Sequence, residues 1–106
     1  MNASEFQNQA EEMFAAIEDQ VEDSGADIDC ENAGGILTFT CEQNGSQIIV
    51  SKQPATCEIW VAAKSGGFHL TWLDGNWFCR VTGETLAELL QRVFQEQSGD
   101  KISFEL

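Results

Sequence analysis

Residues 36–73 read ILTFTCEQNGSQIIVSKQPATCEIWVAAKSGGFHLTWL, and this stretch decides the fold. Short runs rich in β-branched and aromatic residues are separated by turn signals such as Asn44-Gly45 and Gly66-Gly67. Asp74-Gly75 makes a further turn into one more run. Five runs are predicted as strands, at residues 36–41, 47–51, 58–62, 68–73 and 76–80. Their short connections predict an antiparallel meander.

An amphipathic helix is predicted before these strands, over residues 4–23. Its apolar residues recur at spacings of three and four and form one stripe. They are Phe6, Ala10, Met13, Ile17 and Val21. Asn2 and Ser4 are both candidate N-caps, with Glu5 placed for a capping box with Asn2, and Gly25 ends the helix.

A second amphipathic helix is predicted from about residue 83 to 97, with Thr82 as its N-cap and Gly99 as its end. Residues 102–104 then close the chain with an extended segment. Two such helices can cover one face of a sheet. The sequence therefore predicts an α+β fold in a single domain over residues 1–106. It is a two-layer α/β sandwich with two helices on one face of an antiparallel sheet, and the other face is left to solvent or a partner.

The charge of the chain limits the partners that it can bind. The 106 residues include 18 acidic and 5 basic side chains, for a net charge of −13. Binding to nucleic acid or to an anionic membrane through charge requires a basic surface, so we expect neither. The balance favours cations and basic protein surfaces.

The four cysteines, Cys30, Cys41, Cys57 and Cys79, are widely spaced and form no C-x-x-C motif. No signal peptide or long apolar run is apparent, and we expect a cytoplasmic protein with reduced thiols. Each cysteine is interpreted as a small hydrophobic residue in or beside the core. A zinc site has no support from this spacing or from the lone His69.

The densest charge lies at residues 18–31, where seven carboxylates occur without one basic residue. They are Glu18, Asp19, Glu22, Asp23, Asp27, Asp29 and Glu31. Two like charges about 6 Å apart in water repel by roughly 0.7 kcal/mol, which a cation or a basic partner would relieve. Residues 27–31 alternate as an exposed edge strand, and we expect its charged face to continue that of the first helix. We call this set of seven carboxylates the acidic ridge.

Two interpretations of the acidic ridge are open. It can be a solvated face that keeps a small protein soluble, or it can be a binding surface. The density of charge and its continuation onto the strand favour the second. Carboxylate oxygens are hard ligands that suit iron, manganese, calcium or lanthanide ions, and we expect weak, multiple and poorly selective sites.

Trp60 is the main candidate on the uncovered face of the sheet. Ile59 and Val61 alternate into the core, which points Trp60 the other way, together with His69. An exposed tryptophan on an open sheet is typical of an interface anchor, whereas a lone histidine there is more often simply polar. No catalytic motif occurs, and Cys30 beside carboxylates is unsuited to a reactive thiolate.

The chain resembles the frataxin family, in particular its short bacterial form. The motifs that carry the resemblance run nearly end to end: MNASEF, IEDQVED, DIDCE, NAGGILTFT, NGSQIIV, IWVAAKSGGFHL, DGNW and TGETLAELL. The segment from Ile59 to His69 is the most specific of them. Two departures from the family pattern are the short loop Ser24-Gly25-Ala26 and the sequence Ser51-Lys52-Gln53 before Pro54.

The resemblance implies the same sandwich and weak surface binding of iron, as Fe2+ or Fe3+, with other divalent or lanthanide ions able to substitute. The ligands would be the seven carboxylates of the acidic ridge. It also implies a regulator or iron supplier in iron–sulfur cluster assembly. Partners would be the cysteine desulfurase and scaffold proteins, contacted through Trp60, Glu18, Glu22 and Asp23.

Two other functions remain open at this stage. A ferroxidase would oxidise Fe2+ on carboxylate sites, but the paired E-x-x-H ligands of helical ferroxidase centres are missing. A pure interaction module would use the acidic ridge to dock on a basic protein, with metal incidental. We expect a protein that is not an enzyme, monomeric by itself and able to form oligomers with metal.

Overall fold

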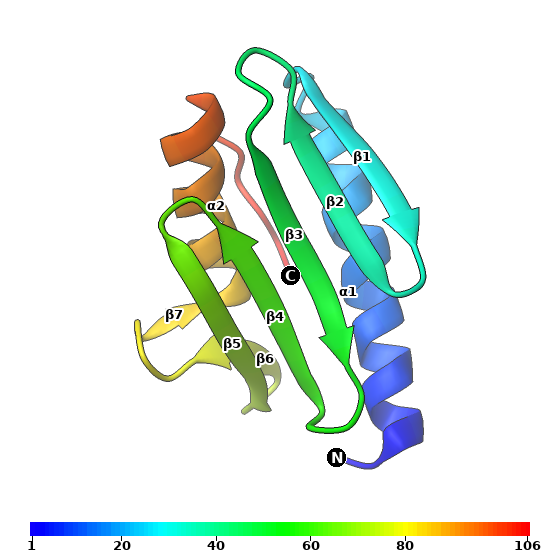
Figure 1. The fold of residues 1–106 in the computed structure, drawn as a ribbon. Helices are drawn as coiled ribbons and strands as arrows, with labels where there is room; N and C mark the ends of the chain where they lie inside the picture. Colours follow the sequence, from blue (N-terminus) through cyan, green and yellow to red (C-terminus); the bar gives the residue numbers. More distant parts are fainter.

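A computed structural model describes all 106 residues and shows two helices packed on one face of a seven-stranded antiparallel sheet. The strands follow one another across the sheet in chain order, as a meander (Figure 1). The elements are α1 Ala3–Asp23, β1 Ile28–Ala33, β2 Ile36–Cys41, β3 Gln47–Gln53, β4 Glu58–Ala63, β5 Gly66–Leu73, β6 Asn76–Cys79, β7 Glu84–Thr85 and α2 Leu86–Ser98. The predicted two-layer α+β sandwich is confirmed, and β1 is an edge strand as expected.

A capping box fixes the start of α1. The Glu5 backbone N–H donates to Asn2 Oδ1 at 2.8 Å, and the Asn2 N–H donates to Glu5 Oε1 at 3.3 Å. Asn2 is therefore the N-cap, rather than Ser4. After the cap residue Ser24, Gly25 adopts a φ of 73°, a left-handed conformation that glycine tolerates and that stops the helix.

The start of α2 differs from the prediction. Thr85, not Thr82, is the N-cap, and it forms a capping box with Glu88. The residues just before it are held extended because the two-residue strand β7 pairs with β6. The hydroxyl of Thr82 instead accepts a hydrogen bond from the Glu84 N–H in a local turn. Sheet pairing thus delays the helix by about one turn.

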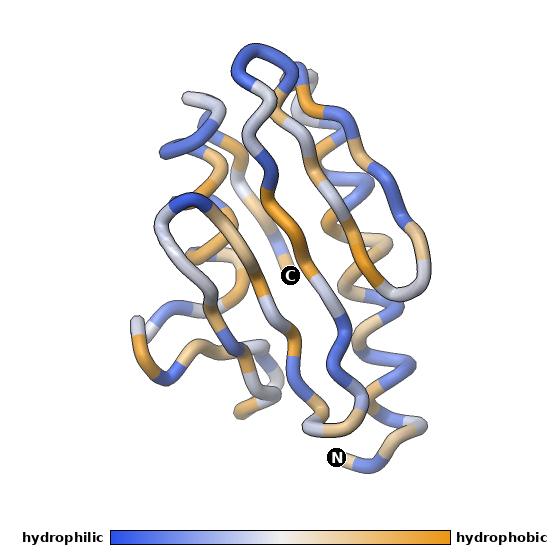
Figure 2. The backbone as a smooth tube through the Cα atoms, in the orientation of Figure 1, coloured by the Kyte–Doolittle hydropathy of each residue, from blue (hydrophilic) through white to orange (hydrophobic).

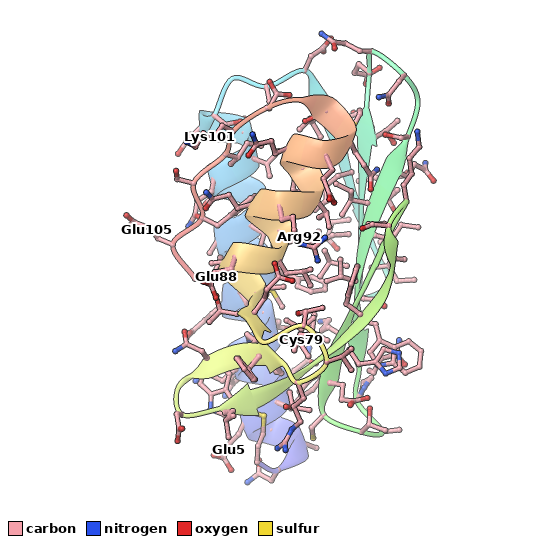
Figure 3. All side chains as sticks on the ribbon, turned by 90° about the vertical axis from the view of Figure 1, so that its left-hand side faces the viewer. Glu5, Cys79, Glu88, Arg92, Lys101 and Glu105 are labelled. Carbon is pink, nitrogen blue, oxygen red and sulfur yellow. The ribbon has the colours of Figure 1, made fainter.

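The core lies between the helices and the sheet, and Figure 3 shows the other face of the sheet without a covering layer. The C-terminal segment belongs to this core, because Ile102 and Phe104 are buried. It lies between the two helices (Figure 1). Gln20 of α1 holds it through two hydrogen bonds of 2.8 Å, one to the Glu105 carbonyl and one from the Glu105 N–H.

The side chain of Gln97, near the end of α2, is the main buried polar group. It is only 7% exposed and makes three hydrogen bonds. Its amide nitrogen donates to Ser46 Oγ and to the Gln47 carbonyl, and its oxygen accepts from the Lys64 N–H at 2.8 Å. These bonds tie α2 to the β2–β3 and β4–β5 turns.

The cysteines follow the prediction with one exception. Cys41 and Cys79 are buried in the core and Cys57 is half-buried. Cys30 is exposed, because it lies on the edge strand β1, which has a neighbouring strand on one side only. Neither helix combines the length and the apolar character that crossing a bilayer requires.

Candidate metal-binding and partner-binding surfaces

The carboxylates of α1 that belong to the acidic ridge have no basic partner. Glu18, half-buried, accepts a hydrogen bond of 2.8 Å from Asn32 Nδ2, which links α1 to β1. Asp19, Glu22 and Asp23 are exposed. The two ion pairs of the protein both involve Arg92 on α2, so none of the seven ridge carboxylates is neutralised by a lysine or an arginine.

The carboxylates of β1 lie on the other side of the sheet edge. Asp29 is opposite Thr40 and Glu31 is opposite Thr38, whereas Cys30 is opposite Phe39, which is buried under the helices. Because strand side chains alternate, Asp29 and Glu31 point toward the open face and away from α1. The acidic ridge therefore bends around the edge strand, with the carboxylates of α1 on one side of it and Asp29 and Glu31 on the other. Figure 2 shows hydrophilic residues recurring along α1 and β1 at this edge.

The geometry of the acidic ridge is open. Nowhere do three or more His, Cys, Asp or Glu side chains come close enough together to hold a metal ion. Pairs one helical turn apart, such as Glu18 with Glu22 and Asp19 with Asp23, are neighbours on the surface of α1. A cation at such a pair would be held by one or two carboxylates and would keep most of its water.

The thiol of Cys30 reports the electrostatics of this edge. Desolvation, followed by the charges of Glu18, Asp29 and Glu22, raises its pKa to about 11. The thiol is therefore neutral near pH 7 although it is exposed, as expected for a cysteine among carboxylates.

The open face of the sheet presents Trp60, which is 37% exposed, between the buried neighbours Ile59 and Val61. Its ring stacks on that of His69, with centroids 4.5 Å apart and planes 8° from parallel. Its indole Nε1 donates to Glu58 Oε1 at 3.1 Å. The predicted orientation of Trp60 and His69 is confirmed, and the stacking on His69 together with the hydrogen bond to Glu58 holds the Trp60 ring in place.

Two residues of these surfaces escaped the sequence analysis. Glu58 orients Trp60, and its position two residues earlier on the same strand face was a signal that could have found it. Asn32 anchors Glu18 across the α1–β1 contact. No local pattern indicates Asn32, because it lies 14 residues from Glu18 and meets it only when β1 packs beside α1.

A family model for the frataxin-like domain matches residues 1–100 of the chain. The chain belongs to the frataxin family. It is 50% identical over 92 residues to the iron–sulfur cluster assembly protein CyaY of Stutzerimonas stutzeri, which covers 85% of this chain and 83% of that protein.

Solved structures agree with this membership. The frataxin of Psychromonas ingrahamii is 30% identical, and the match has a TM-score of 0.92 and covers both chains fully. A trimeric frataxin of the yeast Saccharomyces cerevisiae, in a ferrous complex, is 22% identical with a TM-score of 0.68. That match covers 91% of this frataxin and 87% of the yeast chain, and at this identity it supports the fold alone.

Proposed function

We propose that this frataxin acts in iron–sulfur cluster assembly as an iron-binding regulator or iron supplier, and not as an enzyme. The observation that carries the proposal is the acidic ridge, seven carboxylates that no basic side chain pairs. The relative that is 50% identical over most of the chain is an iron–sulfur cluster assembly protein, which supports the same role here.

Iron would bind the acidic ridge as exchangeable cargo. Hard carboxylate oxygens suit Fe2+ and Fe3+, and other divalent or lanthanide ions can take the same places. Because no three ligands converge, each ion keeps water and remains available for transfer. The ridge residues concerned are Glu18, Asp19, Glu22, Asp23, Asp27, Asp29 and Glu31.

The partners would be the cysteine desulfurase and the scaffold protein of the assembly machinery. Glu18, Glu22 and Asp23 on α1 would attract a basic surface over a long range, which mainly accelerates association. Trp60 on the open face would then form the contact that slows dissociation, because a large flat ring buries much apolar area. The acidic ridge would thus set the association rate, and Trp60 would set the dissociation rate.

A metal titration tests the first half of this proposal. Adding Fe2+ under anaerobic conditions, or a lanthanide, should shift the amide resonances of residues 18–31 before any others. First shifts at His69 or at the buried thiols would contradict the assignment of the acidic ridge as the metal site.

Binding kinetics against the assembly machinery test the second half. Glu18→Lys with Glu22→Lys should slow association and weaken its salt dependence. Glu12→Lys with Glu105→Lys is the control, because it changes the net charge by the same amount at residues outside the acidic ridge. Trp60→Ala should speed dissociation and cost about 2 kcal/mol of binding. Val81→Ala, at a loop residue that is 95% exposed, is the control for loss of an exposed apolar side chain.

Repeating these measurements with and without Fe2+ separates two functions. An iron-dependent regulator binds its partner with a measurably different affinity when Fe2+ is present. A pure interaction module shows the same affinity in both conditions, and that result would contradict the iron-dependent role.

A further inference from the structure

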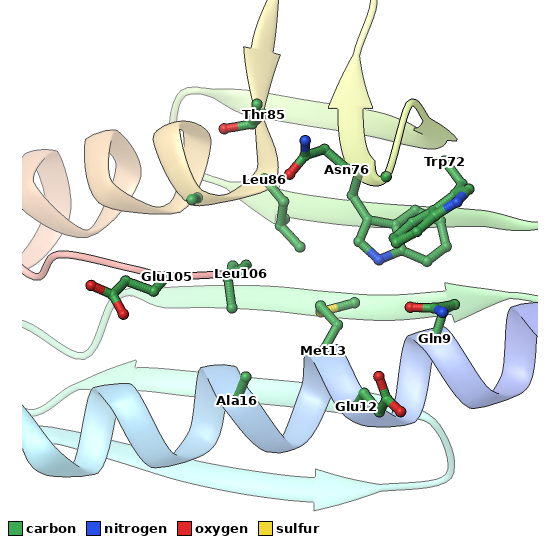
Figure 4. A pocket seen from close by; sticks show the side chains of 13 residues that line it. Gln9, Glu12, Met13, Ala16, Trp72, Asn76, Thr85, Leu86, Glu105 and Leu106 are labelled. Atoms are coloured by element: carbon green, nitrogen blue, oxygen red, sulfur yellow. The ribbon is translucent and has the colours of Figure 1, made fainter.

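A cavity of about 230 Å³ lies on the side of the helix layer away from the acidic ridge residues of β1. Four segments form it: the first half of α1, the β5–β6 turn, the start of α2 and the last two residues of the chain. Figure 4 shows Met13, Leu86 and Leu106 around its centre. Roughly 150 Å³ is enough to hold a benzene ring in an apolar protein cavity. One ring with a short substituent therefore fits this volume.

The cavity wall contains a buried hydrogen-bond donor without a partner. Trp77 is 4% exposed, and its indole Nε1 has no acceptor. The ring is wedged between Phe6, at 5.8 Å and 88°, and Trp72, at 5.2 Å and 70°. It cannot turn to find an acceptor elsewhere without disturbing both contacts. Buried donors in native proteins almost always have a partner, so a molecule in the cavity that offers an acceptor is favoured.

The charges around the cavity restrict the ligand further. Glu12 and Glu105 belong to its wall or rim, and no lysine, arginine or histidine does. The net charge of −13 adds to the same field. An anion is therefore disfavoured, and a cationic group at the rim is attracted.

We propose that this cavity is a binding site for a small aromatic amine that carries a hydrogen-bond acceptor, such as an aryl ether. The ring would fill the space between Met13 and Leu86, the acceptor would face Trp77 Nε1, and the ammonium would lie near Glu12 and Glu105. This site is separate from the acidic ridge and from Trp60, and it does not depend on the function proposed above.

The test is an NMR titration with three probes of one size and different charge. They are 2-phenoxyethylamine, 2-phenoxyethanol and phenoxyacetate. The amine should shift the Trp77 indole N–H resonance saturably and leave that of Trp60 unchanged. The alcohol should bind about fivefold more weakly and the acid more weakly still, because one half-exposed ion pair changes affinity by about that factor. Ethylamine, which lacks the ring, should leave the Trp77 resonance unmoved.

Variants decide whether the cavity itself is responsible. Ala16→Leu should fill the space and abolish binding of 2-phenoxyethylamine, whereas Ala15→Leu, at an exposed neighbour outside the cavity, should not. Trp77→Phe removes the donor and should weaken binding, and if that variant fails to fold the Ala16 pair still decides. The proposal is overturned if no probe shifts the Trp77 indole N–H resonance, the result expected if one water molecule already occupies its acceptor position. It is also overturned if the acid binds as tightly as the amine, or if binding survives Ala16→Leu.

Discussion

The two helices share an architecture but treat their charges in opposite ways. Both begin with a capping box, and neither has a basic residue in its last turn. On α2, Arg92 forms a bidentate ion pair with Glu84, with both N–O distances 2.9 Å, and a second ion pair with Glu96 at 3.3 Å. On α1 every carboxylate lacks a basic partner. Figure 3 shows Arg92 extending from α2 toward the sheet.

This difference separates charges that stabilise the fold, around α2, from charges on α1 that remain free to bind a cation or a partner. Around α2 the charges are satisfied within the protein, and Arg92 also lies over the Phe68 ring, 5.4 Å from its centroid. Around α1 the carboxylates keep their repulsion in the folded state, where the chain holds them close together. Only an external cation or a basic partner can relieve them.

Replacing Arg92 of α2 should have the largest effect on the free energy of unfolding. Arg92→Met keeps an apolar stem over Phe68 but leaves Glu84 without its donors, and the free energy of unfolding should fall by about 1–2 kcal/mol. The melting temperature should drop by roughly 5 °C in a thermal scan. Arg80→Met is the control, because Arg80 is exposed and makes no ion pair. Equal losses in both variants would mean that the pairing on α2 contributes nothing.

The unpaired charges of α1 should be visible in the chemistry of Cys30. With its pKa at about 11, the thiol should react with iodoacetamide roughly tenfold more slowly than an ordinary thiol. Glu18→Gln with Glu22→Gln should accelerate the reaction, since fewer negative charges then oppose the thiolate. Mass spectrometry of the modified peptide measures the rate. The same rate in wild type and variant would show that the charges of Glu18 and Glu22 do not control the thiol.

Neutralising the same two carboxylates should also stabilise the fold. Glu18→Gln with Glu22→Gln should raise the free energy of unfolding by about 0.5–1 kcal/mol at low salt. The gain should shrink at about 0.5 M NaCl, where screening already weakens the repulsion. Urea unfolding at both salt concentrations measures it. A gain that is independent of salt would point to a change in helix propensity instead of charge.

The smallest expected effect is that of acid on the pair between Glu84 and Arg92, which contributes less to the free energy of unfolding at low pH. The hydrogen bonds from Arg92 lower the pKa of Glu84 below its ordinary value of 4.5. The unfolded chain therefore takes up this proton first as the pH falls. The stabilising contribution of Glu84 is complete above that value and disappears as the pH drops below it. Glu84→Gln should flatten this part of the stability profile by well under 1 kcal/mol. An unchanged profile would show that the pair is too solvated to matter.

Much of this fold follows from local sequence signals. The apolar stripe of α1, the Asn2–Glu5 capping box and the turns at Asn44-Gly45 and Gly66-Gly67 act within a few residues. The alternation around Trp60 likewise fixed its face. Such signals depend little on distant contacts, which is why the sandwich and the open face could be predicted.

The errors have tertiary causes or overlooked signals. The start of α2 was misplaced because β7 pairs with β6, although the capping box of Thr85 and Glu88 was present in the sequence. The bend of the acidic ridge depends on which face of β1 meets α1, which periodicity within β1 cannot tell. The cavity beside Trp77 arises only when the chain end docks between the helices, so no local pattern reveals it.

The side chain of Gln97 has a consequence for how backbone amides of the domain exchange with solvent. Its three hydrogen bonds join two hairpin turns to the end of a helix, and all three are lost together if that end of α2 frays. Turns at sheet ends usually exchange their amide protons through small local openings. Here the Lys64 amide is bonded to Gln97, so its proton should exchange with solvent when the end of α2 leaves the sheet. The exchange rate of this turn amide therefore reports how often the end of α2 opens.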